Sequence, residues 1–255
     1  MKFSLKELQG RRSVRQYSGK EIGEKVRASL NAEVTLINTQ VAGMHFQLFF
    51  NDPSPLKGFF NSYGFFKGVS NYLACVVDTS YPDVYEKAGY YAEKFVMEAQ
   101  RLGISTCFVG GTYNKNEVKA MVRASEKLLF LVVFGYKSDA KPSVMARMAV
   151  RMIKGGEAKT DNRHFYDGDD VQYKKKCEMF PWLEDALKAV ACAPSSLNKR
   201  PVRLFYMIEN KLIYARVDES NPKNFIDLGI AKFNFEQVAP DGYWEWGNNQ
   251  PYVPD

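Results

Sequence analysis

The chain has 255 residues, of which 45% are hydrophobic and 14% aromatic, and its formal net charge is +6. This composition excludes a chain that is disordered throughout, and the length allows one large hydrophobic core or two modest ones. No apolar stretch approaches the roughly 18 residues of a membrane span, and the first ten residues contain no signal-peptide core. We therefore expect a compact cytoplasmic protein without a membrane partner.

The positive charge does not indicate a nucleic-acid-binding protein. Basic residues are scattered, and the densest run, KKK at 174–176, has no aromatic platform or binding motif beside it. A solvated face is the better interpretation, although the net charge favours anionic small molecules. No two of the four cysteines lie close together in the sequence, so they predict neither a disulfide framework nor a zinc site. They are Cys75, Cys107, Cys177 and Cys192.

The first third of the chain alternates helical and strand patterns. Weak helical periodicity predicts a helix over 22–36, and MHFQLFF predicts a strand over 44–50. The continuous apolar run at 71–78 is typical of a strand buried on both faces. From Val84 apolar residues recur at three- and four-residue spacing, which predicts a buried helix that ends at Gly103.

Further along, we expect a helix near 115–125 and an apolar strand over 128–136. Residues 137–176 are polar and charged, and are expected to form a long excursion with at most short helices. An apolar stripe then predicts a helix over 182–191, which ends before Pro194. The alternating segment 202–218 is typical of a hairpin, and the last helix is expected over 225–239.

Two pairs of segments indicate a diverged internal duplication. GYYAEKFVMEA and GIAKFNFEQVA share a leading glycine, and with a short gap they align Phe95 with Phe233 and Glu98 with Glu236. Two longer segments, which begin at Val26 and Leu183, both predict a helix, a polar loop and a strand. Matches of this length also arise by chance, so the residues alone leave both explanations open.

Three short motifs could hold a ligand. RRSVR at 11–15 provides guanidinium groups and a hydroxyl, FVGG at 108–111 provides accessible backbone, and APSSLN at 193–198 provides polar groups directly after a helix. Each motif taken alone is more typical of a solvated basic segment, a plain turn or a capped turn.

Together, in this order and spacing, the motifs resemble those of the nitroreductase family, and specifically of its members with two related halves fused in one chain. In ordinary members an R-R-S-x-R segment of one subunit and a P-S-x-x-N-x-Q-P loop of the other hold FMN. Here the loop pattern is intact only in the second half. The resemblance covers nearly all of the chain and implies an α+β fold with a central, mostly antiparallel sheet wrapped by helices, formed by two diverged halves of about 1–170 and 171–255. It further implies one domain over 1–255 that binds FMN as a monomer imitating a dimer.

The resemblance also implies roles for individual residues. Arg11, Arg12 and Ser13 would bind the phosphate and ribityl groups of FMN, and Arg15 the pyrimidine edge. The loop would line the other side of the flavin through Pro194, Ser195, Ser196 and Asn198. Gly110 and Gly111 would place backbone beside flavin N5, and Lys159 or Arg163 would add a cation to the phosphate.

The chemistry implied is hydride transfer from NADH or NADPH, through FMN, to a small aromatic acceptor such as a nitro compound or quinone. No catalytic side chain is required, because the flavin carries the chemistry. Arg200 replaces the glutamine of the family loop, which leaves the hydrogen bonds of the loop and the acceptor preference open. His45 and His164 form no triad, and no metal is expected. The alternative is a flavin-binding carrier or redox sensor without turnover.

Overall fold

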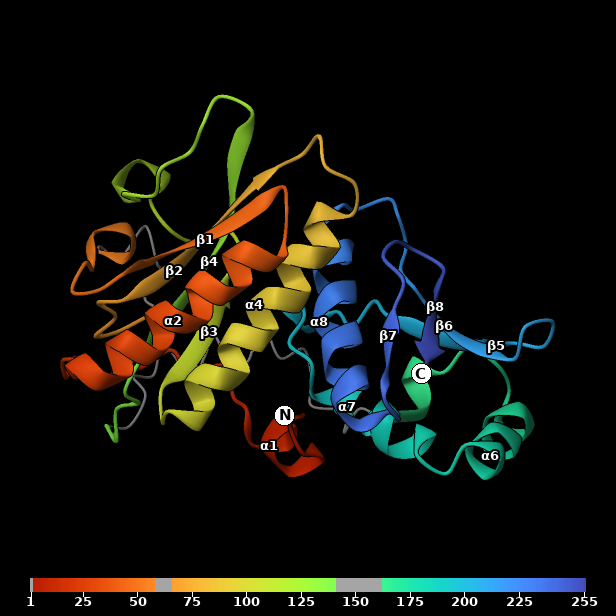
Figure 1. Cartoon of the computed structure of the whole chain (residues 1–255). Coiled ribbons are helices and arrows are strands. Elements are labelled where there is room, and N and C mark those ends of the chain that lie inside the picture. Colours follow the sequence, from red (N-terminus) through yellow and green to blue (C-terminus); the bar gives the residue numbers. More distant parts are fainter. Residues whose placement is uncertain (1, 58–65, 141–161) are drawn as a thin grey trace. The chain divides into compact units, whose positions relative to one another are not determined.

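The computed structural model describes residues 2–57, 66–140 and 162–255. It divides the chain into two compact units, which are described separately (Figure 1). Unit 1 comprises Met1–Arg11, Tyr85–Lys94 and Glu157–Asp255, and unit 2 comprises Arg12–Val84 and Phe95–Gly156. None of the described helices is both long enough and apolar enough to cross a membrane.

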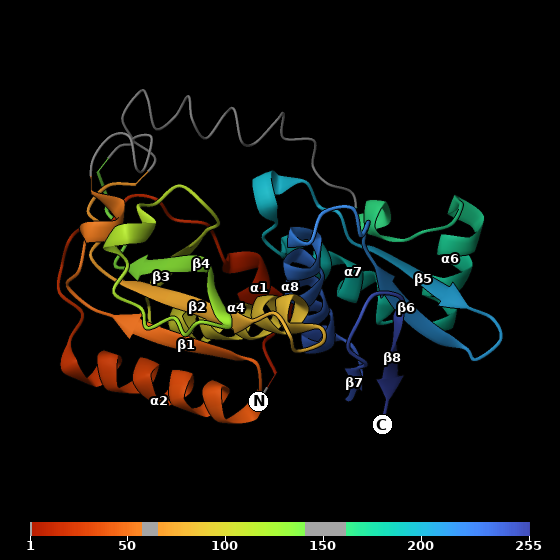
Figure 2. The same cartoon turned by 90° about the horizontal axis from the view of Figure 1, so that it is seen from above.

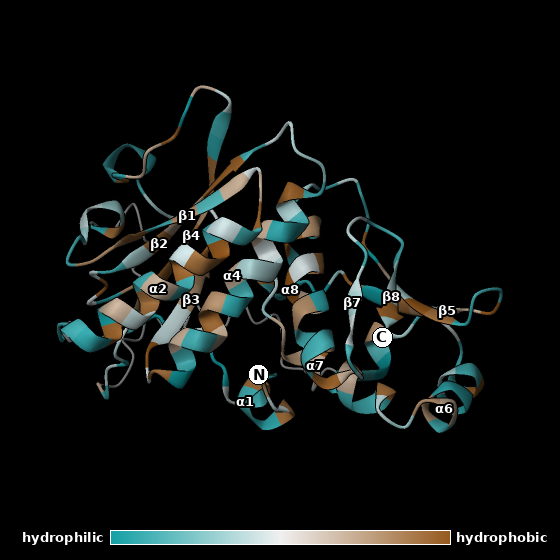
Figure 3. Ribbon diagram, viewed as in Figure 1, coloured by the Kyte–Doolittle hydropathy of each residue, from teal (hydrophilic) through white to brown (hydrophobic). Residues whose placement is uncertain are grey.

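Unit 2 is built on a four-stranded antiparallel sheet with the order β1-β2-β4-β3. Its strands are β1 (Met44–Phe49), β2 (Tyr72–Asp78), β3 (Ser105–Val109) and β4 (Glu126–Gly135). Six consecutive residues of β2 are buried, which confirms the prediction of a strand covered on both faces. Hydrophobic residues accordingly colour the central strands brown in Figure 3.

The helix α2 (Glu24–Gln40) lies along one face of this sheet (Figure 2). It buries Leu30, Val34 and Ile37, whose spacing places them on one side of the helix. The amide of Asn38 fixes its position on β1, because it donates to the carbonyl oxygen of Phe46 at 2.9 Å and accepts from the Phe46 N–H at 2.8 Å.

Unit 1 contains a second four-stranded antiparallel sheet, with the order β5-β6-β8-β7. Its strands are β5 (Arg203–Met207), β6 (Leu212–Arg216), β7 (Gly242–Trp244) and β8 (Gln250–Pro254). Its helices are α1 (Leu5–Gly10), α6 (Asp170–Met179), α7 (Leu183–Cys192) and α8 (Lys223–Val238). Nine consecutive residues of α8, 227–235, are buried, so this helix is enclosed on all sides.

The helices and strands follow one another in the same order in the two halves of the chain. In the first half α2 is followed by β1, β2, α4 (Val84–Arg101), β3 and β4, and in the second half α7 is followed by β5, β6, α8, β7 and β8. The order of the strands within each sheet is also the same. The α+β class and the antiparallel pairing are thus confirmed, with the strands divided between two sheets, and the repeated order of elements agrees with two related halves.

The predicted helix near 115–125 is wrong. Only a 3₁₀ turn, η2 (Lys115–Glu117), forms there, and the following segment is irregular. Its backbone N–H groups are bound by side chains of the sheet: Met121 N donates to Gln47 Oε1 at 2.9 Å, and Lys119 N to the Tyr72 hydroxyl at 3.4 Å. Tertiary hydrogen bonds therefore replace those of a helix. Other short turns are η1 (Ser54–Leu56), η3 (Asn162–Phe165) and η4 (Ser196–Asn198).

Candidate functional site

The segment that follows Arg11 is fixed to the sheet of unit 2. Ser13 forms a parallel bridge with Thr106 of β3, and Val14 N donates to the Thr106 carbonyl oxygen at 2.9 Å. Tyr17, which is buried, donates its hydroxyl hydrogen to the Val14 carbonyl oxygen at 2.7 Å. Arg15 is partly buried and its Nη1 lies 3.5 Å from the Ser13 carbonyl oxygen. Two guanidinium groups and a hydroxyl, those of Arg12, Ser13 and Arg15, are thus carried on backbone that the sheet holds in place.

Gly110 and Gly111 follow β3 directly. Ser13 lies beside Thr106, so the structure brings the RRSVR segment and the strand that leads to the glycines together. Among the described residues, no atom lies within 4 Å of the position that a Cβ would take at either glycine. Neither glycine has a positive φ, so the turn itself does not require them. The open space leaves this backbone accessible to a ligand.

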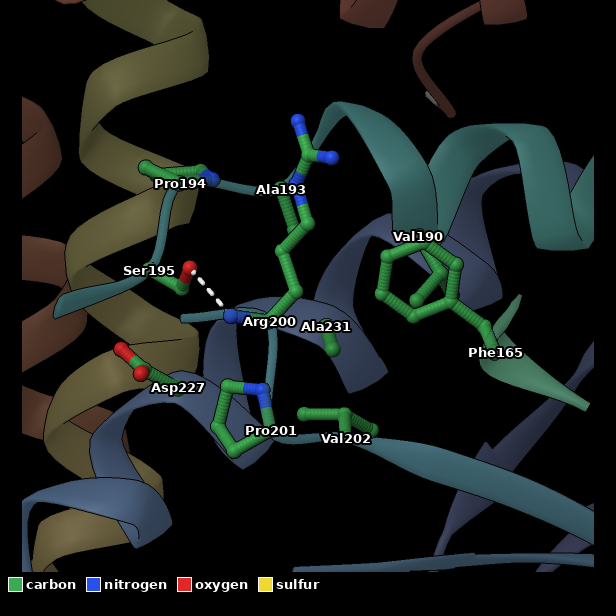
Figure 4. Close-up of a pocket in the computed structure, with 10 residues that line it drawn as sticks. All are labelled: Phe165, Val190, Ala193, Pro194, Ser195, Arg200, Pro201, Val202, Asp227 and Ala231. Atoms are coloured by element: carbon green, nitrogen blue, oxygen red, sulfur yellow. Dashed lines mark hydrogen bonds between the residues drawn. The ribbon is translucent and has the colours of Figure 1, made fainter. Parts of the chain in front are cut away.

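The predicted loop in unit 1, residues 194–201, begins where α7 ends. Ser195 Oγ accepts a hydrogen bond from Arg200 N at 3.0 Å, which closes the loop on itself (Figure 4). Ser196 N donates to both carboxylate oxygens of Asp227 on α8, each at 3.1 Å. The side chains of Ser196 and Asn198 are exposed. The loop therefore presents the polar side chains of Ser196 and Asn198 to solvent, while Asp227 of α8 binds its backbone at Ser196.

Three residues of this loop have left-handed backbone without being glycine. Their φ angles are 51° at Leu197, 57° at Asn198 and 51° at Arg200. Asparagine tolerates this region, whereas a leucine or arginine is strained there. Leu197 is also 64% exposed, so packing of its side chain does not compensate the strain. Strain of this kind collects at functional sites, which makes the loop a candidate.

A small pocket lies beside the loop (Figure 4). It is lined by Phe165, Val190, Ala193, Pro194, Ser195, Arg200, Pro201, Val202, Asp227 and Ala231. Within the described part of the chain, the buried Nε of Arg200 has no hydrogen-bond partner. The enclosed space is far smaller than the roughly 300–1,000 Å³ of typical ligand pockets, so it does not hold a ligand by itself.

Asp227 is 5% exposed, and burial raises the pKa of its carboxyl group to about 7. The hydrogen bond from Ser196 N and the positive charge of Lys199 oppose this rise in pKa. The sequence predictions did not include Asp227. Its signal was a lone acidic residue inside the otherwise apolar stretch FIDLGIA of α8.

Arg11 belongs to unit 1, unlike the rest of the RRSVR motif. Its Nε lies 3.6 Å from Oε1 of Glu93, which is fully buried, and its Nη2 lies 3.3 Å from the Cys192 carbonyl oxygen. Burial raises the pKa of Glu93 to about 7, against the effect of the Arg11 charge. The guanidinium is therefore already engaged inside unit 1, and its contact with phosphate stays a prediction.

The other two predicted phosphate ligands are Arg163 and Lys159, and only Arg163 lies in the described part of the chain. Arg163 donates to Asp170 Oδ1 at 2.8 Å, to the Tyr166 carbonyl oxygen at 2.8 Å and to the Gly168 carbonyl oxygen. These contacts tie η3 to the start of α6, and a role of Arg163 toward phosphate also stays a prediction. Lys159 lies outside the described residues.

Comparisons with known proteins bear on the family and the fold. The family model described as "Putative TM nitroreductase" matches residues 4–239. A solved structure of a putative nitroreductase from Thermotoga maritima is similar with a TM-score of 0.58 at 15% identity, over 97% of this chain and 91% of that one. An FMN-dependent nitroreductase from Clostridium difficile is 16% identical with a TM-score of 0.46, over 65% of this chain and 99% of that one. No curated protein matches the chain significantly.

The family match spans nearly the whole chain, including the first arginine motif, the glycine pair and the loop at 194–201. The Thermotoga structure shares the fold over almost the full length of both chains. The resemblance found in the sequence is thereby confirmed, and this chain belongs to the nitroreductase family that the model describes, a family of oxidoreductases.

Proposed function

We propose that the chain is an FMN-dependent oxidoreductase that transfers hydride from NADH or NADPH to a small aromatic acceptor such as a nitro compound or quinone. The observation that carries the proposal is the family match together with the arrangement in unit 2, where the RRSVR segment lies beside the strand leading to Gly110 and Gly111. One FMN per monomer is proposed because the RRSVR motif and the intact loop each occur once.

The residues present fit FMN in chemical type. A phosphate needs cations or hydroxyl donors, and Arg12 and Ser13 supply them. A flavin ring needs accessible backbone along one edge, and the open space at Gly110 and Gly111 leaves such backbone free. The buried Nε of Arg200, which no described residue binds, offers a further donor.

FMN, when bound, supplies the hydride chemistry at its N5 position. The chain's own residues then have three tasks. Arg12 and Ser13 bind the phosphate and ribityl groups, Arg15 holds positive charge at the pyrimidine edge, and the loop at 194–198 binds the flavin from the other side. Positive charge at the pyrimidine edge stabilises the negative charge that reduction places there.

The test is anaerobic reduction of the FMN-loaded protein. Addition of NADH or NADPH should bleach the flavin absorption, and a nitroaromatic compound or quinone should restore it with stoichiometric consumption of the reduced nicotinamide. Flavin bands that bleach with dithionite but with neither nicotinamide would contradict the enzyme and support the carrier or sensor. A protein with no flavin bands after incubation with FMN would contradict both.

A further inference from the structure

We propose that Asp227 is a positioning residue for the flavin loop, residues 194–201: its carboxylate holds this loop, three of whose residues have left-handed backbone, in the conformation that presents Ser196 and Asn198 to FMN. This inference rests on the proposed function and deepens it, because it assigns a role to a residue that the motifs do not contain. The argument begins with the strain in the loop.

The loop does not hold its shape through its own residues alone. Leu197, Asn198 and Arg200 all have positive φ, and such conformations persist only where surrounding structure imposes them. Within the loop, Asn198 N donates to the Ser195 carbonyl oxygen at 3.0 Å, Lys199 N to the Ser196 carbonyl oxygen at 3.1 Å, and Arg200 N to Ser195 Oγ at 3.0 Å. These bonds shape the turn but do not fasten it to the rest of unit 1.

Arg203 Nη1 holds the far end of the loop by donating to the Arg200 carbonyl oxygen at 3.0 Å, and Asp227 holds its start. Both of its carboxylate oxygens accept from Ser196 N, the amide directly before the first strained residue. Asp227 lies on α8, whose residues 227–235 are buried, so the acceptor is carried by one of the most enclosed segments of unit 1. A charge-assisted hydrogen bond to a backbone amide is about twice as strong as a neutral one. The loop is therefore anchored to the core at the position where its backbone leaves the ordinary regions of φ and ψ.

The carboxylate is unfavourable for the fold as a whole. Asp227 is 5% exposed, and its pKa is raised to about 7, so burial opposes its ionised form more than the bond from Ser196 favours it. A residue selected only for stability would be better neutral at this place. The charge is explained if its hydrogen bond with Ser196 N holds the loop in place.

Within the described part of the chain, three charged or titratable groups near Asp227 come from the loop and from η3. Lys199 acts on it from the loop, Arg200 lines the same pocket, and His164 of η3 hydrogen-bonds to the backbone of Arg200. On α8 itself, Lys223 precedes Asp227 by about one turn. Ionisation of Asp227 strengthens the anchor above pH 7, and protonation weakens it below.

The variant D227N tests the inference because asparagine keeps the shape and one acceptor oxygen but removes the charge. At pH 8, FMN affinity measured by quenching of flavin fluorescence should fall on the order of tenfold, the effect of one weakened charge-assisted bond. Between pH 8 and pH 6 the affinity of the parent protein should fall more than that of D227N. FMN phosphate titrates equally in both proteins, so the difference between the two profiles reports on Asp227.

Two readouts separate positioning from a loss of stability. The thermal midpoint of D227N at pH 8 should be equal to or higher than that of the parent, since a buried charge is removed, and amide hydrogen exchange in residues 194–201 should become faster. The control is D218N, which alters an exposed carboxylate that accepts from the Ser220 backbone N–H at 2.8 Å. It should change neither FMN affinity nor exchange in the loop.

The inference is overturned if D227N binds FMN as tightly as the parent at pH 8, or if its loop amides exchange at the parental rate. It is also overturned if affinity and thermal midpoint fall together while the loop stays protected, because Asp227 then serves only stability. If the parent itself binds no FMN, the proposed function fails, and loop exchange in D227N still decides whether Asp227 holds the loop.

Discussion

Glu93 and Asp227 are two carboxyl groups that burial has moved into the range of neutral pH. Burial raises the pKa of each to about 7, and an adjacent positive charge, Arg11 for Glu93 and Lys199 for Asp227, opposes the rise. A pKa above that of the unfolded chain means that the folded state holds the proton more tightly. The stabilisation from these groups is therefore complete at low pH and is lost as pH rises toward about 7.

The variant E93Q should remove the share of this pH dependence that Glu93 contributes. Glutamine carries no proton that can be lost, so the free energy of unfolding should decrease less between pH 4.5 and pH 7 than it does in the parent. Above pH 7 the variant should be the more stable protein. Urea unfolding at a series of pH values measures this, and an E93Q profile parallel to that of the parent would mean that folding does not shift the pKa of Glu93.

Arg15 is the residue whose predicted role in redox chemistry is most specific. If its guanidinium faces the pyrimidine edge of FMN, R15A should weaken binding of reduced FMN more than binding of oxidised FMN, by about 1.5–3 kcal/mol. The reduction potential of the bound flavin should fall accordingly, and R15K should recover part of the loss. Spectroelectrochemical titration measures the potential; an R15A potential equal to the parental one would place Arg15 away from the ring.

At the scale of elements, the first half of α4 and α8 pack without a side chain between their backbones. A Cβ on Gly89 would lie 2.0 Å from the Ile226 carbonyl oxygen, and a Cβ on Gly229 would lie 1.9 Å from the Glu86 carbonyl oxygen. In both cases the contact is to the residue three positions before the other glycine. Gly89 of α4 and Gly229 of α8 thus have equivalent positions, and each lets the backbone of the other helix approach closely.

The variant G229A should separate these helices and lower the free energy of unfolding by about 1–3 kcal/mol, the usual effect of overpacking. The oxygen that a new methyl group meets belongs to the backbone and cannot rotate away. The control is G23A, where no described atom lies within 4 Å of the added Cβ. Chemical denaturation of both variants should show the difference; equal stability of G229A and the parent would mean that the helices can move apart freely.

The same two helices share a fully buried ion pair. Lys232 Nζ donates to Glu86 Oε1 at 2.6 Å and to the carbonyl oxygens of Glu245 and Gly247 at 2.9 and 3.0 Å. Glu86 Oε2 accepts from Gly247 N at 2.7 Å. Each charge is therefore compensated, and the pair also fixes the segment that leads from β7 to β8.

Removal of one partner should be much worse than removal of both. K232M leaves the Glu86 carboxylate buried without its cation and should lower stability by about 3–5 kcal/mol, whereas K232M/E86Q should lose less than the sum of the two single variants. D241N, which breaks the exposed pair between Lys2 and Asp241, should change stability by less than about 1 kcal/mol. Additive losses in the double variant would contradict a direct coupling.

For the whole molecule, the repeated order of elements supports the proposal of an internal duplication. The alignment that pairs Phe95 with Phe233 needs a gap inside α8, and α8 is one continuous helix, so this alignment does not fit the structure. Without a gap, the equivalence of Gly89 and Gly229 pairs Phe95 with Phe235, and both side chains are fully buried.

The sequence predicted the long elements and missed those that depend on distant partners. The apolar patterns are strong in these elements: α4 and α7 each bury one face, and β2 is a continuous run buried on both faces. The segment at 118–125 has a helical pattern, but Gln47 and Tyr72 bind its amides, and residues so far away leave no trace in a local pattern. The motifs identified the loop at 194–198, whereas Asp227 was missed because no spacing rule links it to Ser196.

The central claim is that this chain binds a single FMN, and titration of the monomeric protein with FMN tests it most directly. Quenching of flavin fluorescence together with the mass of the complex in solution gives both the stoichiometry and the oligomeric state. The account predicts saturation at one FMN per chain in a monomer. No saturable binding, two equivalent flavins per chain, or binding only by a dimer would contradict it.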